Sequence, residues 1–240
     1  MRVEIIGSPA ELQPKKVVGK NVAVIDVLRA TTVIVTALQN GTTAVIPKEH
    51  VEDARQCYNT IKNTGALLGG ERNAVKIEGF HLANSPFEYT REVVEGKTII
   101  LTTSNGTRAL IGSRGANNIT IASFLNATAV ANWLGNEGEN VAIVCAGSAE
   151  SYTLEDALCA GMIAHILSER FKASLSDFAF TLKYLYIGFE GDLMAGLANC
   201  NHAQLLISKG FLADINYCLQ KDVTDLVPKL LEGIIIVPKP

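Results

Sequence analysis

A carboxylate, a guanidinium group and two hydroxyl groups follow one apolar run near the start of the sequence. Residues 22–25 are apolar and rich in β-branched side chains, and Asp26, Arg29, Thr31 and Thr32 come directly after them. Asp26 could act as a metal ligand, a nucleophile or a general base, and Arg29 could bind phosphate or carboxylate through two parallel hydrogen bonds. The simpler interpretation is that Asp26 caps the following turn and pairs with Arg29.

A second acid–base pair follows a predicted strand at residues 66–68. Gly69 and Gly70 precede Glu71 and Arg72 there. Glycine lets the backbone turn tightly and come close to a ligand. Glu71 and Arg72 could simply pair with each other, but two such pairs at two strand ends favour a shared functional role.

The strongest candidate for anion binding by composition is the stretch Thr102-Thr103-Ser104-Asn105-Gly106-Thr107. It follows a predicted strand at residues 97–101 and precedes a helix predicted to start near Thr107. Free backbone N–H groups and the helix dipole favour an anion at such a place. An ordinary N-cap explains part of this composition, but five polar residues among six exceed what capping requires.

Two adjacent acids, Glu155 and Asp156, open a predicted helix at residues 154–171. Acidic side chains in a first turn complement the helix dipole, which explains one acid well and two adequately. The alternative is a magnesium site, because Mg²⁺ binds a few carboxylates together with water and substrate oxygens.

Cysteine and histidine give weaker signals. Cys145 ends a predicted strand, but Ser151 stands where a cysteine phosphatase would have its arginine, so we interpret Cys145 as a packing residue. The four histidines have no metal-ligand spacing. His165 lies on an apolar helix and is interpreted as structural, whereas His81 and His202 lie near polar loops and remain open.

Strand, turn and helix recur in the regions that carry these side chains. The units cover residues 22–39, 98–112, 119–134 and 141–171. Further strands are predicted at residues 3–6, 42–47 and 234–237, and further helices at residues 51–64 and 86–94. This alternation predicts one α/β domain over residues 1–240, with a largely parallel sheet that the C-terminal tail makes mixed. Ligands of such sheets bind at the carboxyl ends of the strands.

Composition excludes several classes of protein. The chain has 240 residues, a formal net charge of −3 and 19% charged residues, which is ordinary for a globular protein and argues against a nucleic-acid partner. Five widely spaced cysteines predict neither a disulfide framework nor a zinc site. No segment resembles a signal peptide or a membrane span, so we expect a soluble, cytoplasmic protein without a membrane partner. The sequence leaves the oligomeric state open, a homo-oligomer included.

Six short motifs in order resemble the 2-phosphosulfolactate phosphatase family. The motifs are Asp26-Val27-Leu28-Arg29-Ala30-Thr31-Thr32, Gly69-Gly70-Glu71-Arg72, Asn84-Ser85-Pro86, Asn105-Gly106-Thr107-Arg108, Ser123-Phe124-Leu125-Asn126 and Cys145-Ala146-Gly147, followed by Glu155-Asp156. The match is strongest from about residue 20 to about residue 165. One departure is visible, because the family loop Asp-Leu-Gly-Asn-Ser-Pro begins with His81 in this chain.

The resemblance implies a three-layer α/β/α fold and a magnesium-dependent phosphatase that converts 2-phospho-3-sulfolactate to 3-sulfolactate and phosphate. In archaea this step belongs to coenzyme M biosynthesis, whereas a bacterial relative would simply make sulfolactate. Magnesium and arginine would stabilise the charge of the transferring phosphoryl group. The partner is then a small anionic substrate.

The residue patterns and the resemblance together give a set of expected site residues. Asp26, Arg29 and Glu71 are expected to be catalytic. Magnesium is expected at Asp26, Glu71, Glu155 and Asp156. Substrate contacts are expected from Arg29, Thr31, Arg72, Asn84, Ser104, Asn105, Gly106, Thr107, Ser123, Asn126 and Gly147.

Two other functions use the same residues. A binding protein for a phosphorylated or sulfonated acid could hold its ligand at the anion turn without hydrolysis. A transferase or lyase acting on another 2-phospho acid would release a product other than free phosphate.

Overall fold

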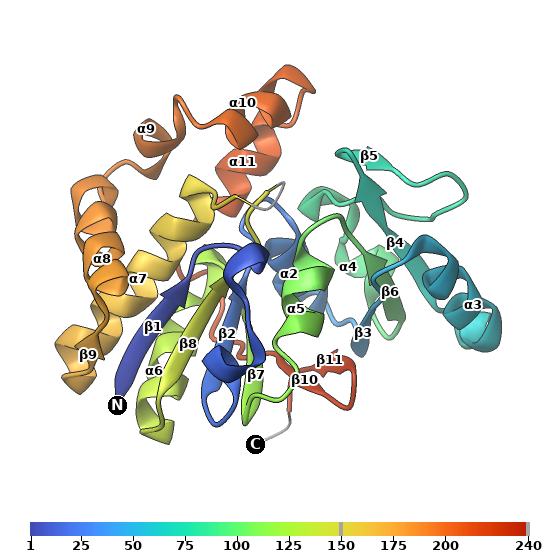
Figure 1. Cartoon of the computed structure of the whole chain (residues 1–240). Helices are drawn as coiled ribbons and strands as arrows, with labels where there is room; N and C mark the ends of the chain where they lie inside the picture. The colour runs from blue at the N-terminus through green and yellow to red at the C-terminus, as the bar shows by residue number, and fades with distance from the viewer. Residues whose placement is uncertain (149–150, 239–240) are drawn as a thin grey trace.

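The computed structural model describes residues 1–148 and 151–238 of the chain. Within them, eleven strands form one sheet in the order β5-β4-β6-β3-β11-β10-β7-β2-β8-β1-β9, with helices on both faces (Figure 1). The predicted α/β class, the three layers and the mixed, largely parallel sheet are confirmed.

The sheet consists of two parallel parts that an antiparallel pair joins. One part holds β7 (Asn118–Ala122), β2 (Asn21–Ile25), β8 (Val141–Cys145), β1 (Arg2–Ile6) and β9 (Ser174–Leu175). The other part holds β3 (Ala44–Pro47), β6 (Thr98–Thr102) and β4 (Leu67–Arg72), with β5 (Val75–Lys76) antiparallel at its edge. The tail supplies the joining pair, β10 (Lys229–Leu231) and β11 (Ile234–Ile236).

Alternate residues of β2 point to opposite faces of the sheet. Val22 and Val24 belong to the apolar cluster that contains α5 (Gly106–Gly112). Ala23 and Ile25 belong to the cluster that contains α6 (Ala127–Glu137), α7 (Leu154–Phe171) and α8 (Asp177–Phe189). β2 is buried on both faces, as its unbroken apolar run predicts.

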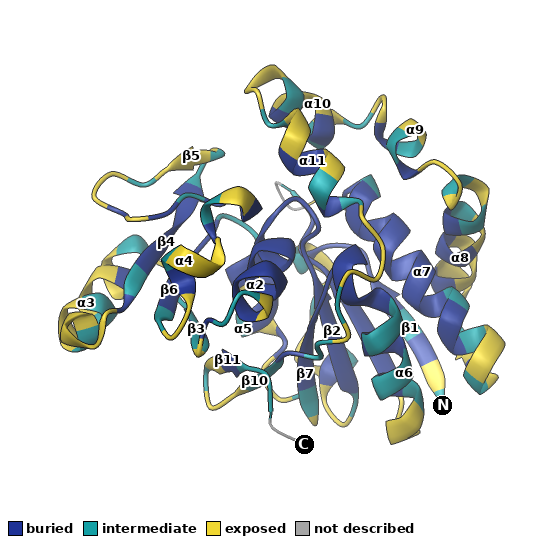
Figure 2. Cartoon of the chain, turned by 180° about the vertical axis from the view of Figure 1, so that it is seen from behind, coloured by how far each residue is buried: buried dark blue, intermediate teal, exposed yellow. Residues whose placement is uncertain are grey.

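Helix α2 (Ala30–Gln39) fills the space between the two parallel parts. It contacts β7 on one side and β3 on the other. Every residue from Ala30 to Leu38 is buried, and Figure 2 shows the helix dark blue along its length. A helix that is buried on all sides is typical of such a central position. The start of α2, directly after Arg29, is thereby held rigidly next to the end of β2.

Some predicted boundaries differ from the structure. The helix predicted at residues 86–94 is a 3₁₀ turn, Pro86–Glu88, followed by the short α4, Arg91–Val94. Helix α2 begins at Ala30 rather than near residue 33. Strand β4 continues to Arg72 because Gly70 passes close to β6, where a Cβ atom would lie 2.0 Å from the Thr102 carbonyl oxygen.

The remaining helices either pack on the sheet or lie above its carboxyl edge. Helix α3 (Val51–Ile61) packs on β4 and β6. Helices α9 (Leu193–Leu197), α10 (Asn201–Ser208) and α11 (Leu212–Cys218) lie above that edge, opposite the β4–β5 hairpin (Figure 1). Among the described residues, no helix is long and apolar enough to cross a lipid bilayer.

Candidate active site

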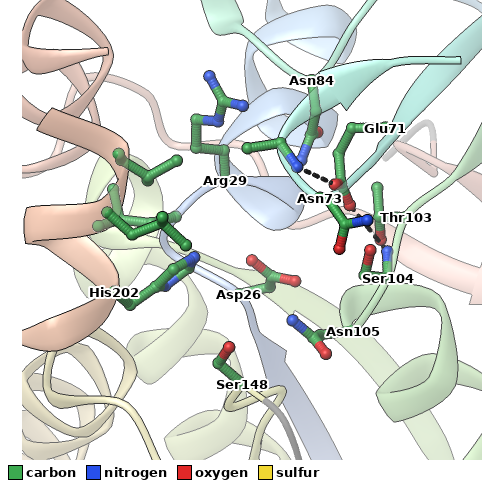
Figure 3. Close-up of a pocket in the computed structure, with 14 residues that line it drawn as sticks. Asp26, Arg29, Glu71, Asn73, Asn84, Thr103, Ser104, Asn105, Ser148 and His202 are labelled. Atoms are coloured by element: carbon green, nitrogen blue, oxygen red, sulfur yellow. Dashed lines mark hydrogen bonds between the residues drawn. The ribbon is translucent and has the colours of Figure 1, made fainter. Parts of the chain in front are cut away.

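A pocket of about 290 Å³ opens at the carboxyl ends of β2, β4 and β6. Helix α10 forms its opposite wall. Ten polar side chains line it and surround a common space in Figure 3: Asp26, Arg29, Glu71, Asn73, Asn84, Thr103, Ser104, Asn105, Ser148 and His202. Six of the residues expected from the sequence, Asp26, Arg29, Glu71, Asn84, Ser104 and Asn105, therefore share one pocket.

Asp26 directly follows β2 and is 8% exposed. Its Oδ1 accepts a hydrogen bond from the Ala30 N–H at 3.1 Å, whereas Oδ2 accepts none from the described residues. Burial, together with the charges of Glu71 and Glu155, raises the pKa of Asp26 to about 6. The hydrogen bond from the Ala30 N–H and the charge of His202 lower this pKa, but by less. A carboxylate with one unused oxygen and a raised pKa is suited to bind a cation or to accept a proton.

Thr31 holds the backbone of Asp26 in place and does not line the pocket. Its Oγ1 accepts from the Asp26 N–H and donates to the Asp26 carbonyl oxygen, both at 2.9 Å. Gly106 approaches the carboxylate from α5, since a Cβ atom there would lie 2.7 Å from Asp26 Oδ2. Thr107 donates its hydroxyl to the Thr103 carbonyl and stabilises the first turn of α5. Thr31, Gly106 and Thr107 were expected to contact the substrate, but they support the site from outside the pocket lining.

Glu71 organises two loops at the pocket wall. Its Oε1 accepts the Ser104 N–H at 2.9 Å and its Oε2 accepts the Ala74 N–H at 2.8 Å (Figure 3). Arg72 points elsewhere and donates to the carbonyl oxygens of Glu71 and Glu49 and to Thr102 Oγ1. The Glu71–Arg72 motif thus fixes the end of β4, with only the acid at the pocket.

Arg29 is a buried cation with part of its guanidinium group unused. It is 2% exposed, and its Nη1 donates to Asp214 Oδ2 of α11 at 2.5 Å. Its guanidinium carbon lies 4.0 Å from the centre of the Phe211 ring. The pair and the ring fix the plane of the guanidinium group, and its remaining N–H groups donate no hydrogen bond to the described residues. An anion in the pocket can accept them.

His202 enters the pocket from α10. Its Nδ1 lies 2.6 Å from Oε1 of Glu155, which is 1% exposed at the start of α7. Burial and the charge of Arg29 lower the pKa of His202. The hydrogen bond and charge of Glu155, together with the charge of Asp26, outweigh them and raise this pKa above its ordinary value. Since Glu155 Oε2 also accepts from the Cys200 thiol, Glu155 faces His202 rather than the pocket.

Asp156 ties the loops after β2 and β8 together. Its two carboxylate oxygens accept the N–H groups of Val27, at 2.8 Å, and Gly147, at 3.0 Å. Gly147 has φ +59°, and a Cβ atom there would lie 2.2 Å from the Ser151 carbonyl oxygen. Glycine is therefore required at this turn. Part of the predicted small-residue loop, residues 149–150, lies outside the described residues.

Ser123 and Asn126 form a reciprocal cap after β7. Asn126 Oδ1 accepts the Ser123 N–H, and Ser123 Oγ accepts the Leu125 N–H. Asn126 Nδ2 also donates to the carbonyl oxygens of Ile121 and Leu226. The two side chains connect β7 to the tail and do not line the pocket.

Two buried polar atoms at the pocket have no hydrogen-bond partner among the described residues. They are Asn84 Oδ1 and Thr103 Oγ1. An unpaired polar atom in a protein interior is unfavourable by about 1–3 kcal/mol. The Thr103 hydroxyl can donate a hydrogen bond to an anion, whereas the Asn84 oxygen can only accept one.

Several residues at the site gave little signal in the sequence. Asn73 is a turn residue of the β4–β5 hairpin, Ser148 lies in a loop, and Asp214 is one acid on an ordinary helix. The only sequence signal for His202 was its position near a polar loop. Cys145 is buried in the apolar core, and burial raises the pKa of its thiol, which is consistent with packing.

The departure at position 81 lies outside the pocket. His81 Nδ1 accepts the Leu68 N–H at 3.0 Å. A carboxylate oxygen could accept the same hydrogen bond, so an aspartate and a histidine can fix the backbone of β4 in similar ways.

The four acids expected to hold magnesium do not converge. In the described part of the chain, no three His, Cys, Asp or Glu side chains are arranged to hold a metal ion. Glu155 and Asp156 use their oxygens within the protein, whereas Asp26 offers Oδ2, and Asn105 lines the same pocket. Mg²⁺ needs only one or two protein carboxylates when water and phosphate oxygens complete its shell, so Asp26 fits such an ion.

Fold and pocket together define an α/β protein with a polar pocket at the carboxyl edge of its sheet. The model of the family described as 2-phosphosulpholactate phosphatase matches residues 7–233. The chain therefore belongs to that family, which is one of phosphoric monoester hydrolases.

Clostridial relatives agree over almost their whole length. A protein of Clostridium novyi (strain NT) is 41% identical over 229 residues, which is 95% of this chain and 97% of the relative. A protein of Clostridium acetobutylicum is 41% identical over 239 residues, covering 98% of this chain and 100% of the relative. Both bear the name "Probable 2-phosphosulfolactate phosphatase".

Proposed function

We propose that this protein hydrolyses 2-phospho-3-sulfolactate to 3-sulfolactate and inorganic phosphate. The observation that carries the proposal is the set of unused groups at one pocket: the free N–H groups of Arg29, the unpaired hydroxyl of Thr103, and Oδ2 of Asp26. Family membership supplies the reaction class. Arg29 and the Thr103 hydroxyl would donate hydrogen bonds to the phosphate, and Asp26 would act on the entering oxygen or hold the metal.

We also propose that magnesium takes part, held by Asp26 and by oxygens of the substrate. The substrate carries phosphate, sulfonate and carboxylate groups, whereas Arg29 and His202 are the only described lining residues that can be cationic. Asp26 and Glu71 add negative charge to the same wall. A bound Mg²⁺ would offset this excess and would supply Lewis-acid stabilisation of the phosphoryl oxygens. Sulfolactate would serve coenzyme M synthesis only in an organism that makes the coenzyme.

Product analysis tests the proposal. The protein is incubated with 2-phospho-3-sulfolactate and MgCl₂, ³¹P NMR follows the phosphorus, and mass spectrometry identifies the organic product. We expect inorganic phosphate and 3-sulfolactate to form in equal amounts. Tight binding without phosphate release, unaffected by a chelator, would instead favour a binding protein. Loss of substrate without free phosphate would favour a transferase or lyase.

A further inference from the structure

The imidazole of His202 is held at one nitrogen and open at the other. Nδ1 contacts the buried carboxylate of Glu155 at 2.6 Å, whereas Nε2 makes no hydrogen bond with the described residues. Figure 3 shows the ring at the pocket wall contributed by α10, on the same side as Arg29 and next to Asp26. A carboxylate behind one ring nitrogen fixes the ring and places a proton on that nitrogen, which leaves the other for chemistry in the pocket.

The charges around His202 favour its cationic form. Glu155 of α7 faces Nδ1, Asp26 after β2 adds a second negative charge, and Arg29 opposes both. The neighbouring Cys200 thiol donates to Glu155. Because Glu155 holds Nδ1, a proton on Nε2 faces the pocket and can be donated there.

We propose that His202 protonates the leaving alcohol oxygen of the phosphate ester and that Glu155 is the residue that positions it. This proposal rests on the proposed function, because it assigns a proton donor to that same hydrolysis. A bond forms between phosphorus and the entering water oxygen while the bond between phosphorus and the bridging oxygen breaks. The electron pair of that bond stays on the bridging oxygen and takes the Nε2 proton, which yields the free hydroxyl group of sulfolactate. The water proton returns through solvent to Nε2.

An alkyl phosphate needs such a donor. The leaving group is an alkoxide of a secondary alcohol, which is strongly basic, so proton transfer in the transition state is expected to contribute about 10²–10⁴-fold to the rate. Glu71 cannot supply the proton readily, because both its oxygens accept backbone N–H groups. Asp156 has its two oxygens occupied in the same way.

The test compares two leaving groups in wild-type protein and His202→Asn. The substrates are 2-phospho-3-sulfolactate and its analogue with sulfur as the bridging atom, whose thiolate leaves without a proton. We expect His202→Asn to lower kcat by about 10²-fold or more with the oxygen ester and by less than about 5-fold with the sulfur ester. Loss of equal size with both esters, or no loss with the oxygen ester, would overturn the assignment.

The pH profile gives a second, independent measurement on the oxygen ester. Wild-type kcat should fall at alkaline pH as His202 loses its proton, and this fall should disappear in His202→Asn. Glu155→Gln keeps a hydrogen-bond acceptor and removes the charge, so the alkaline fall should move to lower pH. An alkaline limb that is the same in all three proteins would contradict both roles.

His50→Asn is the matched control, because His50 is exposed at the start of α3 and does not line the pocket. It should behave as wild type with both esters, and thermal melting checks that all variants are folded. If wild-type protein releases no phosphate from the oxygen ester, the proposed function fails. If it does and the variants show no dependence on the leaving group or on pH, only the role of His202 fails.

Discussion

Asp26 is buried, has an unused oxygen and has a raised pKa. We therefore expect its replacement to lower activity and to raise the stability of the fold. Asp26→Asn keeps an acceptor for the Ala30 N–H but removes the charge. We expect phosphate release with MgCl₂ present to fall by about 10²-fold or more, because the charge that orients the metal or water is lost. Turnover near that of wild type would show that Asp26 has no essential role.

The same substitution should stabilise the fold above pH 6. The pKa of Asp26 is about 6 in the folded protein and 3.8 ordinarily, so the folded state holds this proton at higher pH than the unfolded state. Stability is therefore lost as pH rises from about 4 through about 6. In a chelator, Asp26→Asn should raise the free energy of unfolding at pH 7.5 by roughly 2–3 kcal/mol and change it little at pH 4. Urea unfolding at both pH values measures this, and lower stability at pH 7.5 would contradict it.

Arg29 and Asp214 form a buried pair, and removing one charge leaves the other without a partner. The Arg29 side chain is 2% exposed and that of Asp214 is 7% exposed. We expect Asp214→Asn to destabilise the fold by about 3–5 kcal/mol and to weaken substrate binding. Glu95→Gln breaks an exposed pair with Arg91 and should change stability by less than about 1 kcal/mol. Equal effects of the two substitutions in urea unfolding would contradict the structural role of Asp214.

Sequence patterns located side chains at strand ends but could not locate their partners. Asp26, Arg29, Glu71 and Asn105 follow strands, and parallel strands bring their carboxyl ends to one edge. The contact of Arg29 with Asp214 joins residues 185 positions apart, and that of His202 with Glu155 spans 47. Such pairings depend on how helices pack over the sheet, which no local pattern encodes. The same limit explains why Arg72, Ser123 and Asn126 look like ligands in sequence and bind backbone in the structure.

At the scale of elements, the close approach of α5 to the end of β2 keeps Asp26 in place. A Cβ atom on Gly106 would lie 2.7 Å from both Asp26 Oδ2 and the Ala30 Cβ. We expect Gly106→Ala to displace the carboxylate and to reduce kcat by roughly 10–100-fold. Gly112→Ala in the same helix is the control, because its Cβ would meet only the movable side chain of Leu12. Steady-state kinetics of the two variants test this, and equal activity would contradict it.

Element boundaries were predictable where one physical signal dominated. The strand at residues 141–145 and the helix at residues 154–171 agree with β8 and α7. The helix predicted at residues 86–94 is broken instead at Tyr89, whose hydroxyl reaches the Ala83 carbonyl and whose own carbonyl accepts from Asn40. Tertiary hydrogen bonds thus overrode the local helical pattern there.

At the scale of the whole molecule, the tail closes the sheet. The late apolar strand and the mixed sheet were predicted, but the insertion of β10 and β11 between β7 and β3 was not. Ile235 pairs with Val45 and Lys229 with Thr120, which are both far apart in the sequence. Helix α2 lies between the two parallel parts of the sheet, where it contacts β7 and β3 and is buried on all sides.

Magnesium removal tests how the pocket balances its charge. Dialysis against EDTA should abolish phosphate release, and added MgCl₂ should restore it. In Asp26→Asn, the MgCl₂ concentration needed for half-maximal activity should rise at least about 10-fold, because the carboxylate that we propose as a ligand is lost. Activity that survives exhaustive chelation would contradict a role for the ion.

The most direct measurement of the central claim is a crystal structure of Asp26→Asn soaked with 2-phospho-3-sulfolactate and MgCl₂. The account predicts intact substrate in the pocket at the ends of β2, β4 and β6, with phosphate oxygens on the free N–H groups of Arg29. The Thr103 hydroxyl should donate to the ligand, and the bridging oxygen should face Nε2 of His202. Substrate bound at another surface while this pocket stays empty would contradict the account.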